Sequence, residues 1–495
     1  MPTQDTQTGL QLDNQFAREV PGMCVPWRPA PAPAPRWLQF NEALAHELGL
    51  DAQALRGDAG LAVFSGQQIP EGAEPVAQAY AGHQFGHYSP RLGDGRALLL
   101  GEIVAPSGQR FDLAFKGSGP TPFARNGDGK AAVGPVLREF LVAEAMHVMG
   151  VPTTRVLAAV ATGEVIRRER PLPGAILARV AASHLRVGSF EYAARARDTS
   201  LLGQLAEHAI ARHAPQLSGQ PQRYLGLLEQ VVERQAQLIA QWMGLGFIHG
   251  VMNTDNMTIS GQTIDYGPCA FMEHFDPETV FSSIDQEGRY AWTNQPAIAH
   301  WNLSRLAEAL LPLIDEDETR AAELATAILN RYESHLSTCW SDLLRSKVGL
   351  PDGADGASRL AAEYLRLLQR SKVDFTLGWR RLGEAAAGND APLRALFGEH
   401  VAALDEWLAR WRKLFGNVPG SERAQAMAKV NPMVIPRNHL VEQALEAATD
   451  YDDLAPFERL LAEVRRPYDT RADDDPYIQP ATREATANYQ TFCGT

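Results

Sequence analysis

The stretch GFIHGVMNTDNMTISGQTIDYG, residues 246–267, places asparagine and aspartate between glycine-rich turns and short apolar runs. MTIS and QTI flank Gly261, a pattern that predicts two short strands joined as an antiparallel hairpin. Asn256 enters the hairpin and Asp265 leaves it, so their side chains would converge, and an amide oxygen beside a carboxylate suits Mg²⁺. Taken alone, the stretch fits a turn-rich loop better, in which Asn and Asp satisfy backbone groups.

The spacing in this stretch matches the kinase pattern H-R-D-x-x-x-x-N followed by D-F-G. His249 and Asn256 stand the required distance apart, and residues 265–267 read DYG. Val251 occupies the position of the kinase catalytic base, and valine accepts no proton. A carboxylate does stand nearby, at Asp255. Ordinary kinase chemistry has therefore lost its base at the usual position.

Two cationic side chains in strand-like segments are candidate phosphate ligands. Lys116 ends the strand-like RFDLAFK and needs a carboxylate to hold it. The predicted helix 134–149 offers Glu139 and Glu144, and its apolar pattern does not choose between them. Arg179 lies within the apolar AILARVA, where an arginine needs an anionic partner, either a carboxylate or a ligand phosphate.

Two glycine-rich turns are weaker candidates for phosphate contacts. PRLGDGR, residues 90–96, offers backbone amides at Gly93 and Gly95 with Arg96 beside them. RNGDGK, residues 125–130, is a second such turn with basic flanks. A D-G pair is also a common hairpin turn, so neither is specific alone. The histidines of AGHQFGHY, four residues apart and able to share a helical face, suggest packing and hydrogen bonding rather than a metal site.

Composition describes an ordinary globular chain of 495 residues with 45% hydrophobic and 21% charged residues. The net charge of −13 argues against broad binding to nucleic acid or an anionic membrane. The N-terminus lacks the apolar stretch of a signal peptide, and no apolar run approaches a membrane span. Cys24, Cys269, Cys339 and Cys493 form neither a disulfide framework nor a zinc pattern, which favours a reducing, cytoplasmic location.

The order of predicted elements indicates an α+β chain with two packed lobes and a cleft between them. The Pro/Ala-rich residues 26–37 should be extended. Strand patterns dominate about 60–180, with the helix 134–149 among them, and TRVLAAVATGEVIRRER (154–170) reads as two strands across a T-G-E turn. Helical spacing dominates after about 185. The expected divisions are an extension at 1–35, an N-lobe at 36–184, a C-lobe at 185–475 and a tail at 476–495.

Long ordered strings of this sequence resemble the selenoprotein O family of pseudokinase-like protein adenylyltransferases. They extend over most of the chain and are far more specific than any short kinase-like motif. The strings are AYAGHQFGHYSPRLGDGRALLLGE (79–102), DLAFKGSGPTPFARNGDGKAA (112–132), REFLVAEAMHVMGVPTTR (138–155), HGVMNTDNMTISGQTIDYGPCAFM (249–272) and DQEGRYAW (285–292).

The resemblance implies a protein-kinase-like bilobal fold, with a small β-rich N-lobe, one key helix and a large helical C-lobe. ATP would lie reversed relative to true kinases, with its γ-phosphate buried. Lys116 and Arg179 would hold the inward phosphates, and Glu139 rather than Glu144 would pair with Lys116. Asp255 would accept the proton. The resemblance assigns further nucleotide contacts to Gly93, Gly95, Arg96, Asp128, Gly129, Arg186 and Asp265, and the metal to Asn256 and Asp265.

The implied reaction transfers AMP from ATP to a Ser, Thr or Tyr hydroxyl of a protein and releases diphosphate. Mg²⁺ or Mn²⁺ would support it, and UMP transfer from UTP is implied by bacterial members. Cys493 fits the family's C-terminal selenocysteine or cysteine, but Ser282 and Ser283 stand where some relatives carry its partner, which leaves Cys269 as a candidate partner. Two alternatives remain: a conventional kinase, which Val251 disfavours, and a non-catalytic ATP-binding scaffold, which the retained phosphate and metal residues disfavour.

Overall fold

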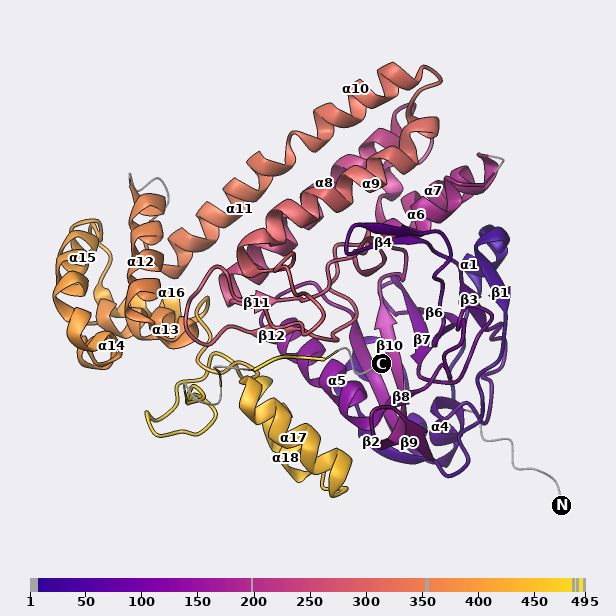
Figure 1. Ribbon diagram of the computed structural model, residues 1–495, viewed down its shortest axis with the longest axis horizontal. Coiled ribbons are helices and arrows are strands. Elements are labelled where there is room, and N and C mark those ends of the chain that lie inside the picture. The colour runs from indigo at the N-terminus through magenta and orange to yellow at the C-terminus, as the bar shows by residue number, and fades with distance from the viewer. Residues whose placement is uncertain (1–7, 197–198, 352–355, 483–485, 487–488, 493–495) are drawn as a thin grey trace.

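The computed structural model describes residues 8–196, 199–351, 356–482, 486 and 489–492. It is an α+β structure, with a β-rich N-terminal part and a helical C-terminal part (Figure 1). The strands are β1 (Cys24–Pro26), β2 (Arg36–Phe40), β3 (Val76–Gln78), β4 (Gly82–Gln84), β5 (His87–Ser89), β6 (Ala97–Val104), β7 (Arg110–Lys116), β8 (Ala131–Ala132), β9 (Arg155–Arg167), β10 (Pro171–Ala181), β11 (Phe247–Ile248) and β12 (Ala270–Phe271).

The α-helices fall into an N-terminal set and a longer C-terminal set. The first set is α1 (Gln15–Glu19), α2 (Glu42–Glu47), α3 (Ala52–Arg56), α4 (Asp58–Phe64) and α5 (Val133–Val148). The second set is α6 (Val187–Ala193), α7 (Ser200–His213), α8 (Arg223–Leu245), α9 (Gln295–Ile314), α10 (Glu318–Leu329), α11 (Tyr332–Lys347), α12 (Ala357–Ser371), α13 (Phe375–Ala386), α14 (Ala391–Phe397), α15 (Val401–Lys413), α16 (Gly420–Ala428), α17 (Asn438–Asp450) and α18 (Ala455–Val464).

The main sheet has the strand order β1-β3-β6-β7-β10-β9-β2, with β8 added beside β10. All these pairings are antiparallel, and Arg179 in β10 stands opposite Ala114 in β7. Side chains alternate between two cores: Leu98 and Leu100 point to the face covered by α2–α4, and Leu99 points to the face covered by α5. Because both faces are buried, the central strands read as continuous apolar runs.

The prediction of two strands across residues 154–170 is wrong. The segment forms the single long strand β9, which pairs with β10 along most of its length. Gly163 adopts φ +76° within the strand, and the register shifts between Pro173 and Ala175 on the partner. The T-G-E sequence therefore makes an irregularity in the ladder instead of a chain reversal, because pairing with β10 continues on both sides of it. The chain reverses after Arg167, at the end of β9.

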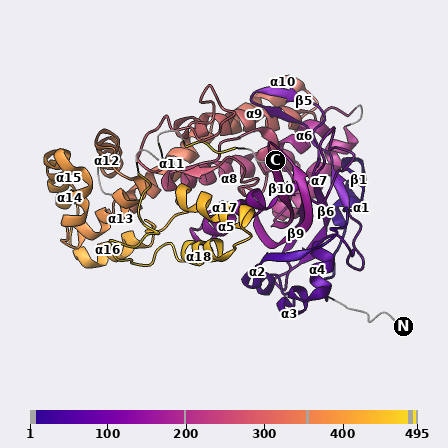
Figure 2. The ribbon, with the colours of Figure 1, turned by 60° about the horizontal axis from the view of Figure 1, so that its bottom comes forward.

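Helix α5 is confirmed within one residue at each end. It packs on the sheet, and helices α17 and α18 return from the C-terminal part to cover its other side (Figures 1 and 2). This explains why both its glutamates are buried and why its apolar pattern is not confined to one stripe. The same core continues into α8 and α9, so it joins the β-rich and helical parts.

Helices α12–α16 gather at the end of the molecule remote from the sheet, at the left of Figure 1, around a core of their own that includes Trp379, Trp407 and Trp411. In the chain as far as it is described, none of the helices is long and apolar enough to cross a membrane.

The Pro/Ala-rich segment is extended, as predicted, and connects β1 to β2. Its alternate backbone N–H groups donate to the body of the protein, from Ala30 to Ser118 O (2.7 Å) and from Ala34 to Thr162 O (3.0 Å). The prolines between them have no N–H to satisfy, so the segment follows the sheet closely without forming a strand.

Candidate active site

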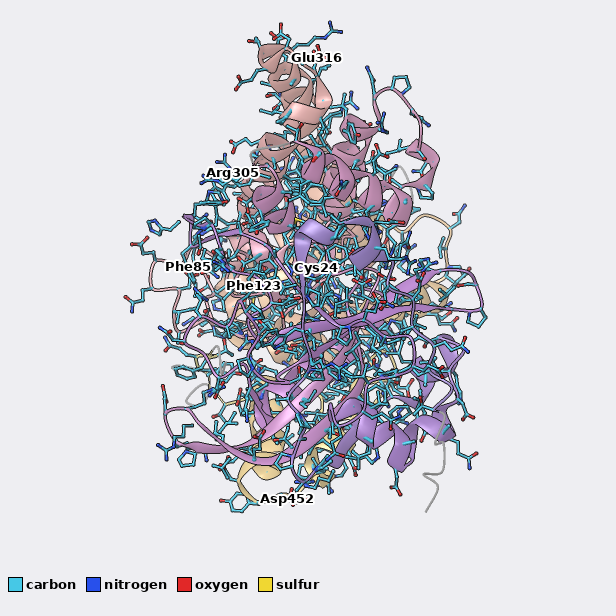
Figure 3. The ribbon with its side chains drawn as sticks, turned by 90° about the vertical axis from the view of Figure 1, so that its right-hand side faces the viewer. Cys24, Phe85, Phe123, Arg305, Glu316 and Asp452 are labelled. Carbon is cyan, nitrogen blue, oxygen red and sulfur yellow. The ribbon has the colours of Figure 1, made fainter. Side chains whose placement is uncertain are left out.

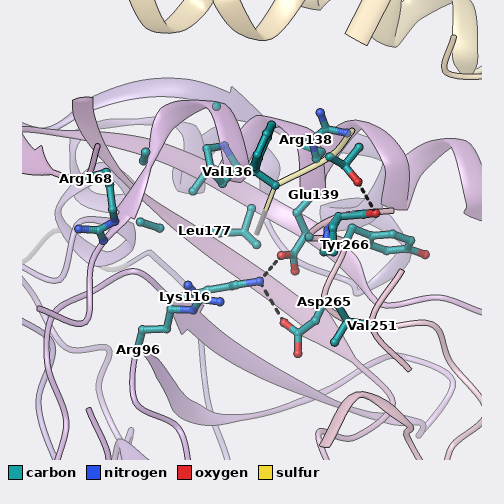
Figure 4. Close-up of a pocket in the computed structure, with 18 of the residues that line it drawn as sticks. Arg96, Lys116, Val136, Arg138, Glu139, Arg168, Leu177, Val251, Asp265 and Tyr266 are labelled. Atoms are coloured by element: carbon teal, nitrogen blue, oxygen red, sulfur yellow. Dashed lines mark hydrogen bonds and ion pairs between the residues drawn. The ribbon is translucent and has the colours of Figure 1, made fainter. Parts of the chain in front are cut away.

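A cavity of about 1650 Å³ lies between the sheet, α5, the segment after β11 and residues near the C-terminus (Figure 4). It gathers most of the residues that the sequence singles out. The predicted site residues that line it are Gly95, Arg96, Lys116, Glu139, Arg179, Arg186, Asp255, Asn256 and Asp265. Gly93, Asp128, Gly129 and Cys269 are not among its lining residues.

Asp265 is the point on which three cationic side chains converge. Its Oδ1 accepts from Lys116 Nζ (3.0 Å) and from Arg179 Nη1 (2.7 Å), and its Oδ2 lies 3.4 Å from Arg186 Nη1. Burial opposes ionisation of this carboxyl, but the three positive charges outweigh burial and hold its pKa well below the usual value. Its backbone has φ +60°, a left-handed conformation that aspartate tolerates better than most residues.

Lys116 also pairs with Glu139 of α5, at 2.6 Å between Nζ and Oε2, so that it lies between two carboxylates (Figure 4). The other Glu139 oxygen lies 3.2 Å from Arg179 Nη1. Glu144, the alternative candidate on the same helix, pairs instead with Arg155 Nε (2.7 Å) and Arg465 Nη2 (3.0 Å).

The predicted hairpin across Gly261 is not formed. Thr258 makes a β-bridge with Arg186 and Thr263 makes one with Thr153, so each side of the turn pairs with a different neighbour instead of with the other side. Strands of two or three residues gain little free energy from pairing with each other, so bridges to tertiary neighbours can compete with the hairpin. Asn256 and Asp265 nevertheless both line the cavity.

His249 fixes the segment that leads into the site. It is buried and stacks on Trp242, with ring centroids 5.3 Å apart, while its Nε2 lies 2.9 Å from Ile264 O and its Nδ1 accepts from the backbone N–H of Val251 (3.3 Å). Burial lowers the pKa of this imidazole, which keeps it neutral and able to accept that bond. Val251, which stands at the base position of the kinase sequence pattern, lines the cavity.

Asp255 is a buried carboxylate, and one of its two oxygens has no hydrogen-bond partner among the described residues. Its Oδ2 accepts from Gln84 Nε2 at 3.3 Å, whereas Oδ1 is buried with no hydrogen-bond partner among the described residues. Burial raises the pKa of this group to about 6, although the positive charge of Arg186 acts in the opposite direction. Gly82 packs directly on it: a Cβ built there would lie 2.6 Å from Oδ1. A carboxyl group with this pKa is mostly ionised at neutral pH and can still take up a proton.

Strands β4 and β5 form a hairpin over this segment that the sequence reasoning missed. The backbone N–H of His83 donates to Thr254 Oγ1 (2.7 Å), and that of Phe85 donates to Asn253 Oδ1 (3.0 Å). The suggestion that His83 and His87 share a helical face is wrong, because they lie on paired strands. His83 does make the expected hydrogen-bonding contact, with Glu191. Gly82 and Gly86 flank a short run that alternates polar and apolar residues, and this pattern was the signal from which a hairpin could have been predicted.

A second missed group lies behind Arg179. His184 Nε2 accepts from Arg179 Nε (3.2 Å), and His184 Nδ1 lies 3.1 Å from Asp112 Oδ2. Arg212 supplies the counter-charge, with Nη2 2.9 Å from Asp112 Oδ1. Burial lowers the pKa of His184, and the nearby guanidinium of Arg179 lowers it further. No sequence motif marks this group, since its members come from β7, β10, α7 and the loop after β10.

The two glycine-rich turns lie beside the cavity. Gly93 has φ +68° and a Cβ there would meet the Phe123 ring at 2.3 Å, so glycine is required at this position for packing. Gly129 has φ +65°, and a Cβ built there would lie 2.2 Å from the backbone of Gly119. Asp128 forms two contacts with Arg168, at 2.8 and 3.0 Å, and Arg168 lines the cavity.

The oxygen donors near the cavity are compatible with a hard divalent cation. Asn256 Nδ2 donates to Val251 O at 3.0 Å, which leaves the amide oxygen of Asn256 to face a ligand. The carboxylate of Asp265, which also lines the cavity, is the other donor. Where the chain is described, no group of three or more His, Cys, Asp or Glu side chains forms a ready metal cage. Such a donor set fits a cation that retains water and shares ligands with phosphates.

The C-terminal tail reaches the same cavity. Thr491 donates from its backbone N–H to Phe281 O (2.8 Å) and from Oγ1 to Pro268 O (2.6 Å), and Ser283 N–H donates back to Thr491 O (3.0 Å). Residues 489–492 line the cavity. Cys493 lies outside the described residues, and Cys269 is a buried free thiol whose pKa burial raises to about 12.

Comparisons with known proteins place this chain among the protein nucleotidyltransferases. The chain belongs to the family described as "Protein adenylyltransferase SelO", which matches residues 9–465. A "Protein nucleotidyltransferase YdiU" of Mycobacterium sp. (strain KMS) is 57% identical over 490 residues, covering 99% of this chain and 100% of the relative. Proteins of the same description from Cereibacter sphaeroides (strain ATCC 17023) and Mycolicibacterium smegmatis (strain ATCC 700084) are 55% and 54% identical, covering 98% and 99% of this chain and 100% and 99% of the relatives. The resemblance inferred from the sequence motifs is confirmed.

Proposed function

We propose that this chain transfers AMP from ATP to Ser, Thr or Tyr hydroxyls of proteins and releases diphosphate. The observation that carries the proposal is the convergence of Lys116, Arg179 and Arg186 on Asp265 in a cavity that also contains Asp255. We further propose that the architecture is a bilobal, protein-kinase-like fold, with an N-lobe of residues 36–184 and a C-lobe of 185–475, and that ATP binds in it reversed.

The buried cations form the phosphate end of the site. Lys116, Arg179 and Arg186 converge there, and their N–H groups can donate to an anionic phosphate group. Lys116 and Arg179 would bind the inner phosphates, because both are buried and already held in place by Glu139. Donors fixed in advance stabilise developing phosphate charge without reorganising during the reaction.

Asn256 and Asp265 would hold the metal, for which Mg²⁺ and Mn²⁺ are both suited to oxygen donors. When bound, the cation neutralises charge on the phosphates. Gly93, Gly95 and Arg96 would flank the nucleotide from one glycine-rich turn, and Asp128 and Gly129 from the other. UTP is proposed as a second donor, because none of these contacts requires a purine.

Asp255 would accept the proton of the attacking hydroxyl. Its raised pKa and orphaned oxygen suit this task, and it replaces the base that Val251 cannot provide. A general base typically contributes about 10²–10⁴-fold. Asp255→Ala should therefore reduce turnover by that order while ATP still binds. Asp265→Ala should abolish nearly all turnover and weaken metal binding, and equal metal affinity in the two proteins would contradict the metal assignment.

The test is labelling with ATP that carries ³²P at either the α- or the γ-phosphate, with Mg²⁺ or Mn²⁺ and a protein acceptor. Label retained only from the α position supports adenylyl transfer. Retention from the γ position would make the enzyme a kinase despite Val251. Retention from neither, with ATP bound, would favour a non-catalytic scaffold. Mass mapping of the oxidised protein tests separately whether Cys493 and Cys269 form a disulfide.

A further inference from the structure

The β4–β5 hairpin also contacts a group of aromatic rings and arginines outside the cavity lining. His83 contacts both Tyr88 and Trp301, with ring centroids 4.9 and 5.2 Å apart. Guanidiniums stack on the outer rings. Arg195 lies 4.0 Å from the centre of Tyr88, and Arg289 and Arg305 lie 5.1 and 5.0 Å from the centre of Trp301. We name these three rings and three arginines the arginine–aromatic patch.

The charges of the patch are largely available to a partner. Arg195 is exposed, and Arg289 and Arg305 are half-buried. Arg305 pairs with Glu308 at 2.6 Å, whereas Arg195 and Arg289 form no ion pair with any carboxylate of the described residues. A chain with a net charge of −13 thus presents a local cationic surface. Stacking on rings holds the guanidinium planes in place, so less side-chain entropy is lost when they bind a carboxylate.

The patch is connected to the proposed base through a few residues of the hairpin. On the inner side, Gln84 donates to Asp255 and Phe85 lines the cavity. At the tip, a Cβ built on Gly86 would lie 3.7 Å from the guanidinium carbon of Arg289. Figure 3 shows Phe85 and Arg305 toward the same edge of the molecule. The patch and the cavity are therefore joined by the consecutive hairpin residues 84–86.

We propose that the arginine–aromatic patch is the docking surface for the acceptor protein, and that it selects acceptors with Asp or Glu residues near the modified hydroxyl. Charge complementarity is the basis: unpaired guanidiniums form charge-assisted, often bidentate hydrogen bonds with carboxylates, and lysine- or arginine-rich acceptors are repelled. The proposal rests on the proposed transfer to protein hydroxyls and adds the class of acceptor.

The test uses the full-length chain with Arg195→Glu and Arg289→Glu combined. The acceptors are two peptides with the same central hydroxyl, one flanked by glutamates and the other by lysines. For the acidic peptide, the double variant should raise KM about tenfold, and the increase should shrink at high salt. For the lysine peptide, the same variant should lower KM. The matched control is Arg366→Glu with Arg370→Glu, two exposed arginines on α12 that form no ion pair with a carboxylate of the described residues and should change neither KM.

An unchanged KM for the acidic peptide, or an equal loss with both peptides, would overturn the proposal. ATP affinity and the thermal midpoint of the double variant are measured beside KM, and Arg195→Gln with Arg289→Gln provides a milder change if the reversal disturbs folding. Absence of α-label transfer by the unmodified enzyme to any protein would contradict the proposed function itself. Transfer at a rate that does not depend on the charge of the acceptor would instead contradict only the docking surface.

Discussion

His184 holds Arg179 from behind, with Nε2 of the imidazole 3.2 Å from Nε of the guanidinium. The contact to Asp112 assigns the imidazole proton to Nδ1, so Nε2 is free to accept. Arg179 is thereby directed with its Nη1 toward both Glu139 and Asp265. The orientation of Arg179, which is proposed to bind phosphate, thus depends on a residue that does not line the cavity.

His184→Phe should weaken ATP binding about tenfold, because it keeps the ring volume but removes the acceptor for Arg179 Nε. Adenosine binding should change little, since the effect acts on the phosphate end. Calorimetry with both ligands measures the difference. His184→Gln, which restores an acceptor oxygen, should recover part of the loss; an equal loss for adenosine would indicate a general structural defect instead.

The rate should fall at acid pH because of Asp255. Burial raises the pKa of this carboxyl to about 6, so it is a carboxylate above pH 6 and becomes protonated as pH falls through that value. A protonated carboxyl cannot accept the hydroxyl proton, and kcat should fall about tenfold per pH unit below 6. Asp255→Asn should have a low rate without this acid limb. A wild-type kcat constant from pH 7 to 5 would contradict the assignment.

Gly82→Ala should misplace the proposed base. The added methyl would lie 2.6 Å from Asp255 Oδ1, and the carboxyl group would have to move. Turnover should fall about 10- to 100-fold while ATP affinity stays within about twofold. Gly203→Ala is the matched control, since a Cβ at Gly203 meets no atom within 4 Å. Equal turnover in the two variants would mean that Asp255 tolerates displacement.

Lys347→Met should stabilise the protein at neutral pH. Lys347 is buried against Trp379, and burial lowers its pKa to about 7. An unfolded lysine titrates near 10.4, so between about pH 7 and 10 the unfolded chain binds more protons and stability rises with pH. The variant removes the free-energy cost of burying the lysine ammonium group. The free energy of unfolding should therefore rise by on the order of 3 kcal/mol at pH 7, and this gain should shrink toward pH 10.

Urea unfolding at both pH values measures that gain, with the exposed Lys413→Met as control. A gain of the same size at pH 7 and pH 10 would show that the ammonium is not the source of the effect.

The parts of the structure that the sequence predicted are those with local signals. Helix α5 has Pro135 in its first turn and Gly150 just after its end, and its bounds were predicted within one residue. Lys116 and Arg179 were singled out because each is a charged residue in an apolar, strand-like run. Asp265 was singled out because it fits the spacing of the kinase pattern. These three side chains do meet in the structure.

The errors arose where distant residues decide the conformation. The T-G-E sequence around Gly163 has the composition of a turn, but β10 pairs on both sides of it. The segments beside Gly261 are too short to choose each other over Arg186 and Thr153. The bond between His184 and Asp112 joins residues 72 positions apart, and no spacing rule reaches that far.

The binding of the C-terminal tail beside the cavity has a practical consequence for work with this enzyme. Phe492 lines the cavity and its side chain is exposed, so a fluorescent probe attached at Phe492→Cys would lie beside the site where nucleotide and acceptor are proposed to bind. Thr491 anchors that stretch to Phe281 and Pro268, which keeps the probe close to the cavity. A change in its fluorescence would therefore report ligand binding without a label on the nucleotide.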